Sequence, residues 1–147
     1  MHSAFFSYCE GIGWALAAGL SAGALAGGFS NSARRPLAAL GAIIAAILFF
    51  VALDSNGHAG WPGPILGTVI SIPAFFLANG IVAGAASRAE GSAGAIAGMV
   101  IAGSVVLGAL FLIVAPVSLA FLVAVLALLA VRRQRQTRKH EGLRVLR

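Results

Sequence analysis

The chain has 147 residues, of which 60% are hydrophobic and 10% charged, and its formal net charge is +6. Soluble domains average about 45–50% apolar and about 25% charged residues, so a water-soluble fold of this size could not bury so much apolar surface. The sequence therefore predicts an all-α fold, that of a polytopic helical integral membrane protein, because lipid is the solvent that such a composition fits.

Apolar blocks follow one another along the chain and predict its membrane spans. A span needs about 20 residues to cross about 30 Å of hydrocarbon. The first three blocks fit one span each, whereas the fourth, from about residue 92 to residue 131, is about twice as long. Pro116 would interrupt that block, because proline lacks the backbone donor of a helix interior. We therefore expect five spans at about 11–29, 37–53, 62–86, 92–113 and 117–131. The alternative is four spans, with the last block forming one long projecting helix.

The positions of the cationic residues favour five spans over four. Cytoplasmic segments of membrane proteins carry an excess of Lys and Arg. Arg34 and Arg35 lie in the first loop, Arg88 lies in the third, and the other seven of the ten cations follow residue 131. Five spans place all ten on one side, with the N-terminus outside and the C-terminus inside. The predicted domains are a transmembrane helical domain, residues 1–131, and a basic cytoplasmic tail, residues 132–147.

Glycines spaced four residues apart predict close helix packing. Residues i and i+4 lie on one face of a helix, and a face of small residues lets two helix backbones approach closely. The candidate packing residues are Gly19, Gly23 and Gly27, Gly80 and Gly84, and Gly94 and Gly98. These stripes could pack helices of one chain together, or could join the chain to another copy or to other membrane subunits. Both uses remain open, and they can coexist on different helices.

The third span carries the polar groups most suggestive of a solute path. Thr68, Pro73 and Asn79 lie within it, and proline frees a backbone carbonyl one turn earlier. A broken helix with free carbonyls and an amide could coordinate an ion or a polar solute. The alternative is a simple kink, with Asn79 bonding a neighbouring helix.

Acidic residues are absent from the middle of every predicted span, which argues against an ion-coupled carrier. They occur only at span ends, in loops or in the tail: Glu10, Asp54, Glu90 and Glu141. The chain also lacks the G-x-S-x-G, P-loop, HExxH and CxxC motifs, so we expect no enzymatic activity. The loop near His58 has too few ligands for a structural zinc site and matches an Asn-Gly turn instead. No metal and no cofactor are expected.

The basic tail directly follows the last predicted span. Polybasic segments in this position bind anionic lipid, with about 1 kcal/mol per cation near the surface. The residues expected to contact anionic lipid are Arg132, Arg133, Arg135, Arg138 and Lys139. This position explains the charge, so no nucleic-acid partner is expected.

These features predict a small non-catalytic integral membrane protein. The favoured function is that of a scaffold or accessory subunit of a membrane complex, or of a homo-oligomer packed through Gly/Ala helix faces. The alternative is a small channel or uncoupled transporter for an ion or small solute. The expected location is the bacterial inner membrane, with the lipid bilayer, other membrane subunits or a second copy as partners and the C-terminus in the cytoplasm.

Overall fold

The computed structural model of the chain describes residues 4–28, 31–88, 93–113 and 116–141, and it is 92% helical. The predicted all-α class is thereby confirmed. In chain order, the elements are α1 (Ala4–Gly28), η1 (Asn31–Ala33), α2 (Arg34–Ser55), α3 (Pro62–Ala86), α4 (Ala93–Ile113) and α5 (Pro116–Glu141).

The fourth apolar block forms two helices rather than one. Helix α4 ends at Ile113 and α5 begins at Pro116. Val114 and Ala115, which lie between the two predicted spans, are outside the described residues. Proline suits the first position of α5, because that position needs no backbone donor. Within the described residues, four helical segments are long and apolar enough to cross a membrane: Ala4–Gly28, Arg34–Ser55, Gly63–Ala86 and Val117–Arg135. The apolar stretch of α4, Gly94–Leu107, is shorter.

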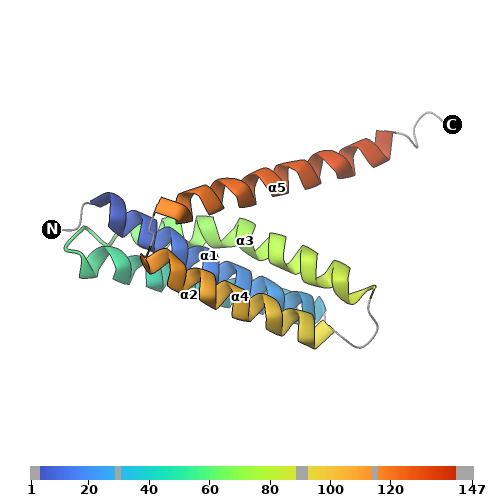
Figure 1. Cartoon of the computed structure of the whole chain (residues 1–147), viewed down its shortest axis with the longest axis horizontal. Coiled ribbons are helices and arrows are strands. Elements are labelled where there is room, and N and C mark those ends of the chain that lie inside the picture. Colours follow the sequence, from blue (N-terminus) through green and yellow to red (C-terminus); the bar gives the residue numbers. More distant parts are fainter. Residues whose placement is uncertain (1–3, 29–30, 89–92, 114–115, 142–147) are drawn as a thin grey trace.

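Helix α1 is the central element of the bundle. It contacts α2, α3, α4 and α5, whereas α2 contacts neither α4 nor α5 within the described part of the chain. Successive helices run in opposite directions, so α1, α3 and α5 point one way and α2 and α4 the other (Figure 1). Helix α5 diverges from the other four helices, so that its C-terminal part projects beyond them (Figure 1).

Small side chains explain how α1 can pack against four other helices at once. Its buried positions are mostly Gly and Ala, and they occur around most of its circumference. Larger side chains fill the space at the level of Leu16, which packs with Phe49 and Leu53 of α2, all three essentially inaccessible to solvent. The core is thus built on α1, with small residues bringing backbones close and a few large residues filling the remaining volume.

The end of α2 is closed by a glycine turn, as the Asn-Gly sequence predicts. Gly57 has a φ of +73°, in the left-handed region that favours glycine. The backbone N–H of His58 donates to the Leu53 carbonyl at 3.0 Å, and that of Gly57 donates to the Asp54 carbonyl at 3.0 Å. This pair of bonds is the Schellman motif, which satisfies carbonyls that the helix leaves free.

Candidate functional site

The glycine stripe of α1 faces α3. Methyl groups added at Gly19 and Gly23 would collide with the α3 backbone at Ser71 and Phe75 respectively. A methyl group at Gly27 would meet Val82 Cβ at 2.8 Å and the Asn79 carbonyl oxygen at 3.0 Å. These three glycines therefore lie where two helices of the same chain touch backbone to backbone, a position that no larger residue could occupy without moving α3.

The other glycines singled out by spacing have different surroundings. Gly80 lies beside the Arg132 guanidinium, whose Nη1 would be 2.6 Å from a methyl group added there. Methyl groups added at Gly84, Gly94 and Gly98 would have no atom within 4 Å. The structure thus separates one stripe that lies inside the bundle from positions that lie on open surface.

The proposed polar path in α3 does not converge on one cavity of the described structure. Helix α3 continues through Pro73 from Pro62 to Ala86. The Thr68 hydroxyl donates to the Pro64 carbonyl at 2.7 Å, within its own helix. Asn79 is buried where α3 meets the C-terminal end of α1, and Thr68 borders an apolar hollow between α2 and α3. Of these three residues, only Thr68 lines one of the cavities described here, so the polar path stays a prediction.

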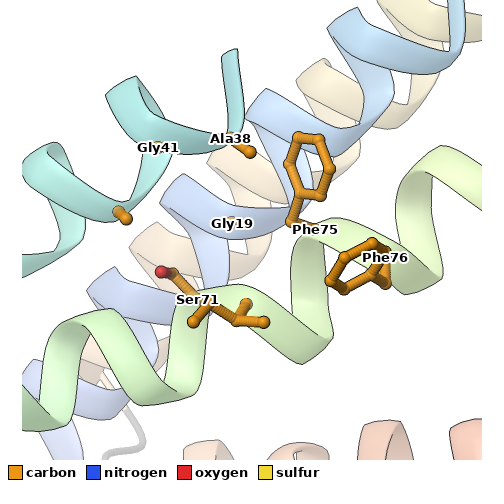
Figure 2. A pocket seen from close by; sticks show the side chains of 8 residues that line it. Gly19, Ala38, Gly41, Ser71, Phe75 and Phe76 are labelled. Atoms are coloured by element: carbon orange, nitrogen blue, oxygen red, sulfur yellow. The ribbon is translucent and has the colours of Figure 1, made fainter. Parts of the chain in front are cut away.

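A small cavity lies where α1, α2 and α3 meet. Its volume is about 40 Å³, and it is lined by Gly19, Ala38, Gly41, Ala42, Ser71, Ile72, Phe75 and Phe76. Figure 2 shows Phe75 turned toward α1 and α2, with Phe76 further around α3 at the edge of the same cavity. The Ser71 hydroxyl is already bonded to the Thr68 carbonyl at 3.0 Å. The cavity has room for a water molecule but not for an organic solute.

A wider groove lies between α2 and α4, with α1 as its floor. Its volume is about 440 Å³. The floor includes Trp14, Ala18 and Ser21, and the walls include Ile44 of α2 and Val105 of α4. The full lining is Trp14, Ala17, Ala18, Ser21, Ala22, Leu25, Leu37, Leu40, Gly41, Ile44, Leu48, Val105 and Ala109. This groove, called the α2–α4 groove below, is almost wholly apolar and open to the surroundings.

Helix α4 borders this groove at Val105 and Ala109, and the face of α4 that holds these two residues carries small residues along the rest of its length. Gly94, Gly98, Ala102, Val105 and Ala109 follow one another at intervals of four and three residues, so they lie on one face of α4. Gly94, Gly98, Ala102 and Ala109 are exposed, as is Val105. Larger exposed side chains, among them Met99 and Leu110, lie around the helix from this face.

Two interhelical hydrogen bonds were not anticipated from the sequence. The Ser21 and Ser104 hydroxyls are 2.6 Å apart and join α1 to α4. The Ser118 hydroxyl donates to the Cys9 carbonyl at 2.7 Å and joins the start of α5 to α1. Both Ser104 and Ser118 are buried, and such bonds hold helices together in membranes. The sequence signal for each bond is a single serine within an apolar run. That signal predicts a hydrogen bond to a neighbouring helix but does not identify the partner residue.

The end of the bundle opposite the arginines holds the described acidic side chains. The Asn56 amide approaches Glu10 Oε2 at 3.5 Å and donates to the Ala52 carbonyl at 2.7 Å. Asp54 is exposed. Among the described residues, no group of three or more His, Cys, Asp or Glu side chains is placed to hold a metal ion.

The cationic residues extend from the ends of α2, α3 and α5. Arg34 lies over the ring of Phe76, with its Cζ 5.5 Å from the ring centroid. Arg132 lies beside Gly80, and Arg133 and Arg135 are exposed further along α5. Arg138 and Lys139 belong to α5, but their side chains lie outside the described residues.

Comparisons of the chain with protein-family models, curated proteins and solved structures give no match. The functional proposal therefore rests on the geometry of the chain itself.

Proposed function

We propose that the chain is a five-span protein of the bacterial inner membrane, with its N-terminus outside and its C-terminus in the cytoplasm. The start of α2, the end of α3 and the end of α5 lie at the same end of the bundle (Figure 1). The arginines of these segments, from Arg34 to Arg135, therefore gather on one side, which the excess of cations marks as cytoplasmic.

This orientation is tested by labelling single cysteines in intact cells with a membrane-impermeant maleimide. Cys9 is first replaced by serine, and cysteine is then placed at exposed Ala59 or at exposed Ser87. Ala59→Cys should react in intact cells, whereas Ser87→Cys should react only after the membrane is opened. The reverse pattern would contradict the orientation, and labelling of both variants in intact cells would contradict a membrane-spanning α3.

We propose that the protein is a non-catalytic scaffold or accessory subunit that receives a helix of another membrane protein, or of a second copy, in the α2–α4 groove. The observation that carries this proposal is the open Gly/Ala face of α4 along that groove. Packing within the chain already occupies the glycine stripe of α1, but it leaves the face at Gly94 and Gly98 uncovered.

The composition of this face supports a protein partner. Glycine weakens a helix by roughly 1 kcal/mol relative to alanine, and lipid tails gain nothing from a flat surface. A second helix does gain from it, because small residues allow close backbone approach and weak Cα–H···O contacts. The α2–α4 groove is also bounded by two helices that do not contact each other within the described residues. The surface of α1 between them is therefore open to a further helix.

Two leucine substitutions on α4 test the proposal. A methyl group at either Gly98 or Gly103 would meet nothing within 4 Å, so both variants should fold. Gly98 lies on the groove face, whereas Gly103 lies about 140° further around the helix. The mass of the assembly extracted gently from its native membrane should fall for Gly98→Leu and stay unchanged for Gly103→Leu.

The composition of the extracted assembly separates self-association from a subunit role. A mass that is a multiple of this chain indicates a homo-oligomer, and other subunits in fixed ratio indicate an accessory subunit. An assembly that survives Gly98→Leu unchanged, or a wild-type chain that is monomeric in its native membrane, would refute the proposal.

A further inference from the structure

We propose that the protein binds one anionic phospholipid on the outward face of α3, between α2 and α5, with the lipid phosphate held by Arg34 and Arg132. The inference rests on two guanidinium groups that reach the same face of α3 from neighbouring helices. It does not depend on the assembly proposed above, which uses the opposite side of α2.

The two arginines approach α3 one helical turn apart. Arg34 comes from the start of α2, and its Cζ lies 5.5 Å from the centroid of the Phe76 ring. Arg132 comes from α5, and its Nη1 would lie 2.6 Å from a methyl group added at Gly80. Phe76 and Gly80 are four residues apart and so lie on one face of α3, about 6 Å apart along its axis. The absence of a side chain at Gly80 is what lets the Arg132 guanidinium lie against the helix.

These positive groups have no acidic partner among the described side chains. The carboxylates described are Glu10 and Asp54, and both belong to the opposite end of the bundle. Like charges on one surface repel each other, and an anion between them removes that repulsion. Guanidinium groups match phosphate oxygens in geometry as well as in charge, because they can donate two parallel hydrogen bonds.

The position of the arginines corresponds to the level of lipid phosphates. The apolar part of α5 ends at Val131, directly before Arg132, and the apolar part of α2 begins directly after Arg35. Both helices therefore place the inner edge of the hydrocarbon near Gly80 of α3, and the anion that is abundant at that edge is the lipid headgroup.

An apolar strip leads from the arginines toward the middle of the bilayer. Ile65, Val69, Ile72 and Phe76 are exposed by 61, 59, 46 and 49% and follow one another at intervals of four and three residues. They lie on the same face of α3 as Gly80. Measured along α3 from Gly80, the strip runs from about 6 Å at Phe76 to about 22 Å at Ile65, so it extends past the depth of about 15 Å that one leaflet occupies. One acyl chain can therefore lie along it while its phosphate reaches Arg34 and Arg132.

Native mass spectrometry of the delipidated full-length chain tests this site. The chain is titrated with phosphatidylglycerol and, separately, with phosphatidylcholine carrying the same acyl chains. The variant Arg34→Gln/Arg132→Gln removes the two guanidinium groups. The matched control Arg88→Gln/Arg133→Gln removes two charges from the same end of the bundle, and Arg133 lies about 100° around α5 from Arg132.

The wild-type chain should bind one phosphatidylglycerol more tightly than phosphatidylcholine. Loss of both guanidinium groups should raise the apparent Kd for phosphatidylglycerol roughly thirtyfold, and the control should retain wild-type affinity. Added glycerol 3-phosphate should not compete, because it lacks the acyl chain. Equal loss in both double variants, no preference for the anionic lipid, or full competition by glycerol 3-phosphate would each overturn the proposal.

Single variants keep the test decisive if the double variant does not fold, as judged by circular dichroism and gel filtration. Arg34→Gln and Arg132→Gln should each weaken phosphatidylglycerol binding. The variant Arg34→Lys/Arg132→Lys should keep the preference for the anionic lipid at reduced affinity, since lysine retains charge but not the paired donors. An effect of Arg132→Gln with none from Arg34→Gln would overturn the two-sided site.

Discussion

Adding one methyl group at Gly23 should separate α1 from α3, although alanine is the better helix former. The new Cβ would lie 2.9 Å from the Cα and carbonyl carbon of Phe75, which are backbone atoms and cannot rotate away. Overpacking of this kind costs about 1–3 kcal/mol. The matched change Gly84→Ala adds a methyl group where nothing lies within 4 Å, so it should stabilise α3 by up to about 1 kcal/mol.

The free energy of unfolding of both variants can be measured in mixed micelles by titrating a denaturing detergent and following circular dichroism. The protein is kept dilute, so that assembly does not contribute to the transition. Gly23→Ala should lower the unfolding free energy, and Gly84→Ala should leave it unchanged or raise it. Equal effects of the two changes, or a gain in stability for Gly23→Ala, would refute the assignment of the α1 stripe to backbone contact with α3.

Further changes test the rest of the bundle. Phe49→Ala should lower the free energy of unfolding by about 3 kcal/mol or more, because Phe49 is fully buried. The control Phe50→Ala, at a position that is 41% exposed, should lower the free energy of unfolding far less in the same titration. Ser118→Ala should lower stability by about 0.6 kcal/mol and increase hydrogen exchange at the start of α5, because it removes the bond to the Cys9 carbonyl; unchanged exchange there would contradict that role. A double-mutant cycle of Ser21→Ala and Ser104→Ala should give a coupling free energy of about 0.6 kcal/mol, and a coupling of zero would mean that the hydroxyls do not stabilise the α1–α4 contact.

The division of the chain into helices could be predicted because it depends on local features. Hydrophobic length sets the elements, and Pro116 marks the break inside the fourth apolar block. The Asn56-Gly57 turn could be predicted for the same reason, because a left-handed backbone position favours glycine.

The use of each glycine stripe could not be predicted, because spacing is the same whether the partner belongs to the chain or not. The pair Gly19 and Gly23 has the same interval as the pair Gly94 and Gly98, yet a methyl group added to the former would meet the α3 backbone, whereas one added to the latter would meet no described atom within 4 Å. That difference is set by which helix lies opposite. The contact between Ser21 and Ser104 is hidden for the same reason, since the two residues are 83 positions apart in the chain.

The central position of α1 also orders the assembly of the protein in time. Helix α1 is synthesised before α3 and α5, yet its glycine face meets α3, and its carbonyl at Cys9 meets Ser118 of α5, which lies 109 residues later. Until α3 enters the membrane, that glycine face has lipid instead of a backbone against it. Helix α1 is therefore enclosed only after its later partners are made, and a chain interrupted before α3 would leave it open to any other helix that can approach closely.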